Sequence, residues 1–538
     1  MKFGEWPVTE VAGAILAHSV KHGAGVFRKG RVLATADVAM LVAAGVEKVF
    51  AARLSPDDVP EDEAAHAVAR VSGGNGTSAQ VPFTGRANLH SSVHGVAVVD
   101  GERVKALNEL HESLTLATIA NHAVVETRQM VATVKVIPFA VPRPILERAL
   151  ALIGNEPLVR VEAFRHSRVG LVITKLPQTK PSLIAKSEAA MHERIAALDG
   201  ALAKVIVADH AITATGAAIT ALHTAGCHPI LVFGASAIVD RGDVIPAAVE
   251  AAGGEVVHLG MPVDPGNLMM FGRLGGVPVI GVPSCARSPK VNGFDWILER
   301  VMAGIHVSAH DIMALGAGGL LAEIPTRPSP REAKPQVQRA PKVAAVVLAA
   351  GKSTRMGSNK LLAEIGGKPM IRHTVEAIST SSVGGVIVVT GRDADLVSQA
   401  LAGVKVDVVH NPNYAEGLST SLKTGLSAVG DADAALICLG DMPRVSAAVI
   451  DKLIAAFNPV EHRAICVPMF NGKPGNPVLW SKQYFDEMKK LTGDNGARQL
   501  FTVYAEDLVE VAMPDDAVLD DIDTPEALER IRDRKSVV

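Results

Sequence analysis

The chain has 538 residues, and 53 Lys and Arg residues against 56 Asp and Glu give a formal net charge of -3. At a prior of ~150 residues per domain, this length predicts two to four domains and excludes a peptide hormone or a one-module adaptor. The near-neutral charge excludes a globally basic surface for nucleic acid or anionic membrane. Apolar residues make up 48% and aromatic residues only 4%, which favours α/β layers rich in small aliphatic side chains.

The cysteines and the start of the chain predict a cytoplasmic protein. The four cysteines lie far apart without a C-x-x-C pair, which is typical of a reduced protein. The first residues lack the basic and apolar regions of a signal peptide, and no apolar run approaches the ~20 residues of a membrane-spanning helix. We therefore expect a protein that is neither exported nor embedded in a membrane.

The first half of the chain divides into two parts. Residues 1–150 are rich in Ala, Val and His and contain glycine turns without a clear phosphate loop, so they predict an accessory α/β lobe. In residues 151–324, short apolar runs alternate with helical stretches such as 243–253, which predicts parallel strands with crossover helices. The predicted strands are 169–174, 204–207, 229–234, 255–259 and 277–282.

A composition shift at 325–341 separates the two halves. Five prolines alternate there with polar residues, which predicts a semi-rigid, extended linker. The strand and helix alternation then resumes through 342–538, with predicted strands at 343–348, 385–390, 404–409, 434–439 and 464–467. The predicted fold class is therefore α/β, with two doubly wound, mostly parallel-sheet units joined by the proline-rich linker and preceded by the accessory lobe.

The strongest chemical signal is the small-residue loop LAAGKSTRMGSNK, which spans 348–360 directly after a predicted strand. Backbone N–H groups in such a loop can approach phosphates or a base edge. Arg355 and Lys360 add cations that suit triphosphate oxygens and the charge that develops during attack on the α-phosphorus. The loop lacks the G-x-x-x-x-G-K-[ST] pattern of a Walker A motif, and a tight turn with surface charges is the alternative. The nucleotide-binding candidates are Leu348, Ala349, Ala350, Gly351 and Ser353, with Gly440 from the motif described next.

A second motif, Gly440-Asp441-Met442-Pro443, ends the predicted strand 434–439. A carboxylate just past a buried strand is well placed to hold a divalent ion such as Mg²⁺ against triphosphate oxygens. Taken alone, such a tetrapeptide is more often a simple turn. Its place at the end of a central strand after the glycine loop favours Asp441 as a catalytic residue and metal ligand.

Together these motifs resemble those of the molybdenum cofactor cytidylyltransferases, and the similarity covers residues 341–538. It includes EGLSTSLK at 416–423, GDNGAR at 493–498 and DIDTPE at 521–526. The resemblance implies CTP as the nucleotide, because the family's GTP-dependent relatives carry a second glycine in place of Ala350. A methyl group there narrows the space beside the base, a contact worth ~1–3 kcal/mol.

The resemblance also suggests contacts to the pterin substrate. Ser419, Thr420 and Ser421 open a predicted helix whose N-terminus suits a phosphate, although plain N-capping explains them nearly as well. Asn476 lies in a substrate-loop motif where the family commonly has another residue. Asp521 and Asp523 are each either a further metal ligand or a surface charge, while the neighbouring Thr524 is predicted to cap a helix.

A weaker resemblance links the first half to the molybdopterin molybdotransferases. It includes the segments FGASA at 233–237, DRGD at 240–243 and MPVDPGN at 261–267. It implies pterin contacts from Ser236, Asp243 and Ser284, with Arg287 and Lys290 nearby. Several family glycines are replaced in the turns at 234–237 and 283–286, so a scaffolding or dimerising role is the alternative.

The predicted reaction transfers CMP from CTP to Mo-molybdopterin, giving molybdopterin cytosine dinucleotide and pyrophosphate. The first half would bind molybdopterin, and the implied recipient is a molybdoenzyme of the xanthine dehydrogenase type. The expected ligands are small molecules and Mg²⁺, without nucleic acid or membrane. Two alternatives remain open: a sugar or polyol phosphate as acceptor, or a non-catalytic chaperone for the finished cofactor.

Overall fold

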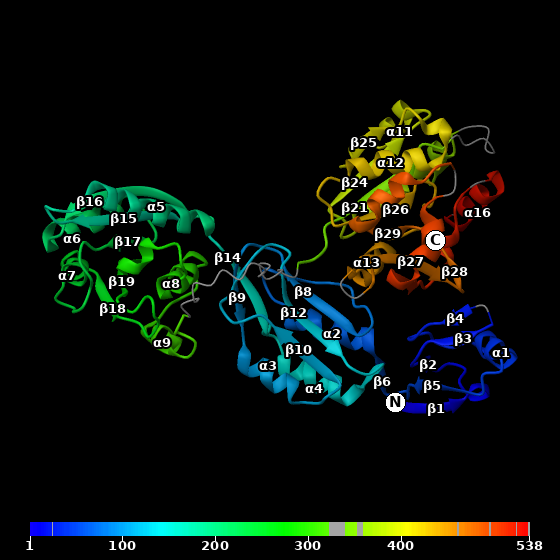
Figure 1. The fold of residues 1–538 in the computed structure, drawn as a ribbon, viewed down its shortest axis with the longest axis horizontal. Helices are drawn as coiled ribbons and strands as arrows, with labels where there is room; N and C mark the ends of the chain where they lie inside the picture. Colours follow the sequence, from blue (N-terminus) through cyan, green and yellow to red (C-terminus); the bar gives the residue numbers. More distant parts are fainter. Residues whose placement is uncertain are drawn as a thin grey trace. The chain divides into compact units, whose positions relative to one another are not determined.

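The computed structural model describes residues 1–23, 25–321, 339–351, 359–459, 462–493, 496–522 and 524–535. The chain forms two compact units (Figure 1). Unit 1 comprises Met1–Ala79 and Gly85–Arg339, and unit 2 comprises Gln80–Thr84 and Ala340–Val538. Within the described residues, we find no helix with the length and hydropathy needed to cross a membrane.

The accessory part of unit 1 contains two separate hydrophobic cores. The first lies beneath a three-stranded antiparallel sheet of order β1-β5-β2, and the second packs α2 and α4 against a sheet of order β10-β12-β8-β7. All strand pairs in these two sheets are antiparallel, as is common for sheets that bury only one face. The elements are β1 (Lys2–Pro7), β2 (Ile15–Leu16), α1 (Thr35–Ala43), β5 (Lys48–Arg53), α2 (Glu61–Ser72), β7 (Thr77–Ala79), β8 (Arg86–Ser91), β10 (Leu114–Thr118), β12 (Met130–Val136) and α4 (Arg143–Ile153).

The rest of unit 1 is built on a six-stranded sheet of order β16-β15-β17-β20-β19-β18. The five strands predicted from sequence run in one direction, and only β19 is reversed. Helices α5 and α8 pack in the core on one face, while α6 and α7 pack in the core on the other. The elements are β15 (Arg168–Lys175), α5 (Pro181–Ala197), β16 (Ala201–Asp209), α6 (Ile212–Thr224), β17 (Ile230–Phe233), α7 (Val244–Ala251), β18 (Glu255–Leu259), β19 (Met270–Leu274), β20 (Val277–Val282) and α8 (Gly293–Met302).

The order of this sheet creates a switch point between β15 and β17. From β15 the chain passes to β16 on one side and then returns to β17 on the other. In doubly wound folds, ligands bind outside the carboxyl ends of the strands at such a point. The carboxyl ends of β15 and β17 are therefore where the fold of unit 1 favours a site.

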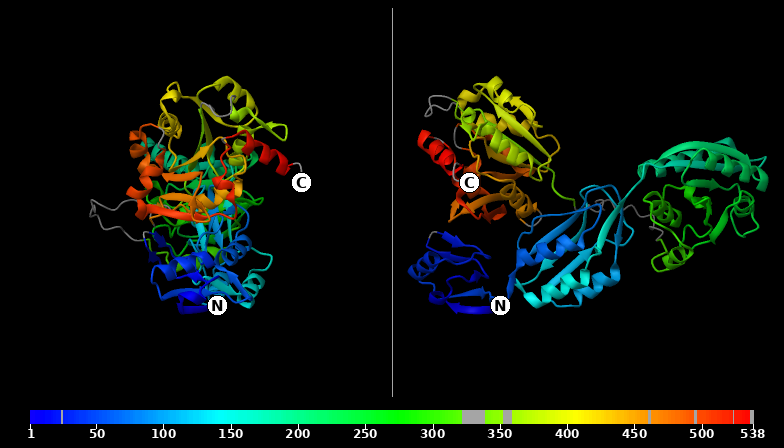
Figure 2. Two further views of the ribbon diagram at one scale, coloured as in Figure 1. Left: turned by 90° about the vertical axis from the view of Figure 1, so that its right-hand side faces the viewer. Right: turned by 180° about the vertical axis from the view of Figure 1, so that it is seen from behind.

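Unit 2 has a sheet of order β25-β24-β21-β26-β29-β27-β28, with β30 paired to β27. The strands predicted from sequence again run in one direction, whereas β29 and β28 are reversed. Helices α10, α11 and α13 cover one face of the sheet, and α12 and α14 cover the other. Figure 2 shows this unit, coloured from yellow-green to red, from two further sides. The elements are β21 (Val343–Ala349), α10 (Met370–Ser379), β24 (Gly385–Thr390), α11 (Ala394–Ala400), β25 (Asp407–His410), α12 (Leu418–Ala428), β26 (Ala434–Leu439), α13 (Ala447–Ala456), β27 (Ile465–Phe470), β28 (Lys473–Pro474), β29 (Val478–Ser481), α14 (Phe485–Lys490), β30 (Leu508–Ala512) and α16 (Pro525–Lys535).

Candidate active site

Asp441 lies immediately past the carboxyl end of β26 and is held there by its neighbour Gly440. The Gly440 N–H donates to the Leu348 carbonyl at 3.1 Å, and the Thr374 hydroxyl donates to the Gly440 carbonyl at 3.2 Å. A Cβ at Gly440 would lie 2.9 Å from the Ile371 Cδ1, so a larger residue would push this turn away from α10. Asp441 itself is only 8% exposed, which leaves its carboxylate fixed and largely shielded from water.

Lys360 provides the opposite charge. It begins a 3₁₀ turn, Lys360–Leu362, in which the Asn359 side-chain oxygen accepts from the Leu361 N–H at 3.1 Å. The Lys360 ammonium forms an ion pair with the Asp441 carboxylate, and both side chains are less than one-sixth exposed. The structure therefore brings together two residues that the sequence analysis selected from different motifs. Ser353 and Arg355, from the same loop as Lys360, lie outside the described residues.

These two residues face a cavity of about 340 Å³, which we call the polar pocket. Leu348, Ala350 and Gly351 line it from the end of β21, whereas Ala349 packs into the core on one face of the sheet. The Ala350 methyl group lies close to the backbone of Gly391, where an added Cβ would come within 2.8 Å of it. Three of the predicted nucleotide-binding residues thus line one cavity, and Ala349 and Gly440 are each next in the chain to residues that line it.

The three predicted hydroxyl residues lie in the first turn of α12. The Asn411 side-chain amide donates to the Thr420 hydroxyl at 2.9 Å and to the Ser421 hydroxyl at 3.0 Å. Thr420 also donates to the Gly417 carbonyl at 2.9 Å, while Ser419 is buried. Ser421 lines the polar pocket. Part of the hydrogen-bonding capacity of this cluster is therefore used to fix the loop before α12.

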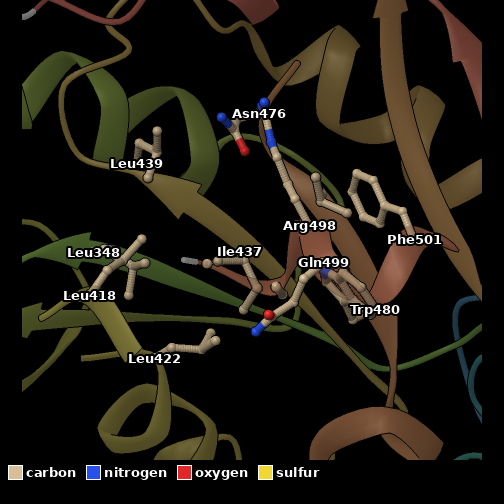
Figure 3. Close-up of a pocket in the computed structure, with 13 residues that line it drawn as sticks. Leu348, Leu418, Leu422, Ile437, Leu439, Asn476, Trp480, Arg498, Gln499 and Phe501 are labelled. Carbon is tan, nitrogen blue, oxygen red and sulfur yellow. The ribbon is translucent and has the colours of Figure 1, made fainter. Parts of the chain in front are cut away.

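A second cavity of about 430 Å³ adjoins the first, and we call it the apolar pocket. The two cavities share the lining residues Leu348, Leu418 and Leu439. Figure 3 shows these leucines opposite the ring of Phe501, with Arg498 extending toward Asn476. The pocket is lined by Leu348, Leu418, Leu422, Ile437, Leu439, Asn476, Val478, Trp480, Gly496, Ala497, Arg498, Gln499 and Phe501.

The aromatic wall of the apolar pocket was not predicted from sequence. Trp480 and Phe501 stack with ring centroids 5.6 Å apart, and both line the cavity. The chain contains only three tryptophans, so Trp480 could have been singled out as a residue worth placing. Arg498 ends the GDNGAR motif that carries the family resemblance, but it was not selected as a site residue.

Asp441 is also the candidate metal ligand. The Ile522 N–H donates to the Asp441 carbonyl at 3.2 Å, and Asp521 directly precedes Ile522 in the chain, while Asp523 lies outside the described residues. Among the residues that are described, no cluster of three or more His, Cys, Asp or Glu could hold a metal. One buried carboxylate fits Mg²⁺, because this ion commonly completes its shell with substrate phosphates and water. The Thr524 hydroxyl accepts from the Ala527 N–H at 3.3 Å, as expected for a cap of α16.

In unit 1 the structure brings together two of the three predicted pterin contacts. Ser236 and Ser284 line one cavity of about 160 Å³, which we call the serine pocket, at the carboxyl ends of β17 and β20. Asp243 instead accepts from the Val239 and Asp240 N–H groups at 2.6 and 3.0 Å. Those backbone hydrogen bonds lower the pKa of Asp243 and give it a role in shaping the loop.

Comparison with known protein families gives matches to two parts of the chain. Residues 345–509 match the MobA-like NTP transferase domain, and residues 5–53 match a domain of unknown function, DUF8806. Unit 2 carries a MobA-like nucleotidyltransferase domain. The polar pocket of this domain, with Lys360 and Asp441, is therefore the candidate active site of a nucleotidyltransferase.

Individual relatives match the same part of the chain. The molybdenum cofactor cytidylyltransferase of Escherichia coli is 28% identical over 186 residues, which are 34% of this chain and 91% of that protein. The bifunctional protein GlmU of Agrobacterium fabrum is 38% identical over 113 residues, but the chain spans only a quarter of its length. Among solved structures, a nucleotidyl transferase from Methanothermobacter thermautotroptrophicus is 28% identical with a TM-score of 0.33, covering 36% of this chain and 97% of that one.

Proposed function

We propose that the MobA-like domain transfers CMP from CTP to Mo-molybdopterin and releases pyrophosphate. The observation that carries this proposal is the contact between two unlike pockets. The polar pocket offers charged groups to a triphosphate, and the adjoining apolar pocket offers aromatic and aliphatic walls to a flat ring system. The cytidylyltransferase of Escherichia coli, matched over 91% of its length, supports the choice of acceptor.

In the proposed reaction, a phosphate oxygen of the pterin attacks the α-phosphorus of CTP in line. The bond from the α-phosphorus to the bridging oxygen breaks, and pyrophosphate leaves without a covalent protein intermediate. The Lys360 ammonium offsets the negative charge that develops on the phosphates, and the α12 N-terminus with Ser421 orients the acceptor. Asp441 would hold Mg²⁺, which neutralises triphosphate charge when bound. Catalysis on this scheme is positioning combined with electrostatic stabilisation.

Two further features bear on substrate choice. Ala350 lines the polar pocket, and its methyl group reduces the space available to a purine base. Arg498 and Asn476 lie at one end of the apolar pocket, where a guanidinium and an amide can bind oxygens of the acceptor (Figure 3). We propose CTP as the nucleotide and a pterin as the acceptor on these grounds.

A pyrophosphate-release assay tests the proposal. Full-length protein with Mg²⁺ and Mo-molybdopterin should release pyrophosphate with CTP and much less with GTP. Equal turnover of GTP would contradict the nucleotide assignment. Release with a sugar or polyol phosphate but not with the pterin would contradict the acceptor, and tight cofactor binding without any release would indicate a chaperone.

We also propose that unit 1 binds molybdopterin at the serine pocket and presents it to unit 2. Tethering raises the local concentration of an unstable substrate, and the dinucleotide product would serve a recipient enzyme of the xanthine dehydrogenase type. Calorimetric titration of full-length protein with molybdopterin should then give two sites per chain. Ser284→Val should leave one of them, whereas a stoichiometry of one that Asn476→Ala abolishes would exclude binding by unit 1.

A further inference from the structure

Three side chains form a hydrogen-bonded chain at the switch point of unit 1. Thr174 is the penultimate residue of β15, His210 directly follows β16, and Ser236 lies in the turn after β17. The Thr174 hydroxyl lies 2.9 Å from the His210 Nδ1, and the Ser236 hydroxyl lies 3.0 Å from the His210 Nε2. A serine, a histidine and a group that orients the histidine are the parts of an activated nucleophile.

The hydrogen bonds of Thr174 offer two tautomers to the imidazole. The Thr174 hydroxyl accepts from the Ala235 N–H at 2.8 Å and has one hydrogen, which it can donate to the His210 Nδ1, 2.9 Å away, or to the Phe233 carbonyl, 3.4 Å away. When it donates to the carbonyl, it accepts from the imidazole and the His210 Nδ1 carries the hydrogen. The Nε2 lone pair then faces the Ser236 hydroxyl, which is the arrangement a general base requires.

The fold fixes this geometry on its buried side, at Thr174, and leaves it accessible to solvent on the other side, at Ser236. Thr174 is 2% exposed and binds both the imidazole and the turn that carries Ser236. A Cβ on Gly234 would lie 2.6 Å from the Ser236 carbonyl oxygen, so the tight turn needs glycine there. Ser236 itself is exposed and lines the serine pocket. An activated nucleophile has an accessible hydroxyl and a buried group that orients its base. A serine that only forms a hydrogen bond in the core lacks that access.

We propose that Ser236 is a nucleophile activated by His210, and that the serine pocket takes the short acyl group of a carboxylic ester. The Ser236 Oγ bonds to the ester carbonyl carbon while its proton passes to the His210 Nε2. The bond from that carbon to the leaving oxygen breaks, and His210 returns the proton to the alcohol. Water then attacks the acyl-serine with His210 as base, releasing the acid and restoring Ser236.

The surroundings of the pair suit this chemistry. Asn267 and Ser284 line the same cavity and supply N–H and O–H donors for a developing oxyanion. A cavity of about 160 Å³ is well below the ~300–1,000 Å³ that encloses a drug-sized ligand, so it can enclose a short acyl chain, while most of any larger ligand would lie outside it.

This inference is independent of nucleotidyl transfer, and covalent labelling tests it. Full-length protein treated with a fluorophosphonate should be modified at Ser236, as located by peptide mass spectrometry, and should hydrolyse p-nitrophenyl acetate. If molybdopterin occupies the serine pocket, it should slow the labelling.

Matched variants separate an activated serine from an ordinary one. Ser236→Ala should abolish labelling, His210→Gln should slow it at least ~10-fold, and Thr174→Val should slow it through loss of the orienting hydroxyl. Ser92→Ala removes another exposed serine and should change nothing. Circular dichroism checks that each variant folds. Labelling that is absent at Ser236, or that is equally fast in His210→Gln, would overturn the proposal.

Discussion

At the scale of single residues, the pairing of Lys360 with Asp441 determines the electrostatics of the candidate active site. Both side chains are largely shielded from water, so each controls the electrostatic environment of the other more strongly than a surface pair would. A substrate that brings phosphates and a cation can separate them, with Lys360 turning to the phosphates and Asp441 to the cation. The pair thus keeps two opposite charges ready in a site that must accept a highly charged ligand.

Removing either charge should therefore reduce CMP transfer sharply. Asp441→Asn keeps the shape but loses the negative charge, and we expect a drop of ~100-fold or more in kcat. Lys360→Met should also act mainly on kcat, because the charge it offsets grows during the reaction. Asp431→Asn is the control, since Asp431 pairs with Lys342 on the exposed surface and should leave turnover unchanged. Full activity in Asp441→Asn would contradict the assigned role.

Glu299 on α8 gives unit 1 a predicted dependence on pH. Burial, reinforced by nearby Asp295, raises the pKa of Glu299 from 4.5 to about 7. Between these values the folded state holds more protons than the unfolded state, so the free energy of unfolding falls as pH rises from about 4.5 to 7. We expect Glu299→Gln to remove this loss and to stabilise unit 1 by about 1–3 kcal/mol at pH 8. Urea unfolding, followed by Trp296 fluorescence, measures this free energy of unfolding at each pH. Glu188→Gln, at an exposed position, is the control. A pH profile that Glu299→Gln leaves unchanged would contradict the prediction.

At the scale of elements, most strands that run in the common direction could be predicted from sequence, whereas the reversed strands and the parallel strand β30 could not. Continuous apolar runs such as β21 and β26 are typical of strands buried on both faces. The reversed strand β19 is joined to β20 by Gly275 and Gly276, both with positive φ, so it forms a hairpin that a search for crossover helices misses. The aromatic wall of the apolar pocket escaped prediction for a related reason. Trp480 lies on the reversed strand β29.

The packing of α12 on the sheet links an element to the active site. A Cβ on Gly425 would lie 2.3 Å from the Val346 Cγ1, so the helix rests directly on β21. Gly425→Val should move α12 outward, cost about 1–3 kcal/mol of stability and lower CMP transfer, because the first turn of α12 borders the polar pocket. Ser427→Ala, on the exposed side of the same helix, should have little effect. Thermal unfolding and the pyrophosphate assay measure the two effects, and unchanged stability of Gly425→Val would contradict this packing.

At the scale of the whole molecule, the composition shift at 325–341 is more informative than any single motif about organisation. The division between the compact units falls at 339 and 340, by the end of that segment. The segment Gln80–Thr84 belongs to unit 2 although it lies early in the chain, and Phe83 packs against the core of that unit. No local pattern in the sequence marks such a long-range contact, because its partners lie more than 250 residues apart in the chain.

Each unit has hydrophobic cores of its own, so each should unfold in its own transition. The three tryptophans allow this to be measured, because Trp6 and Trp296 belong to unit 1 and the buried Trp480 belongs to unit 2. In a Trp6→Phe, Trp296→Phe variant, Trp480 fluorescence follows unit 2 alone. Mg²⁺ and CTP at ~100 times the dissociation constant should raise the free energy of unfolding of unit 2 by ~2.7 kcal/mol. The unit 1 transition, which Trp296 reports in a Trp480→Phe variant, should not change. A single transition common to all reporters, or an equal shift of both, would show that the units do not unfold independently.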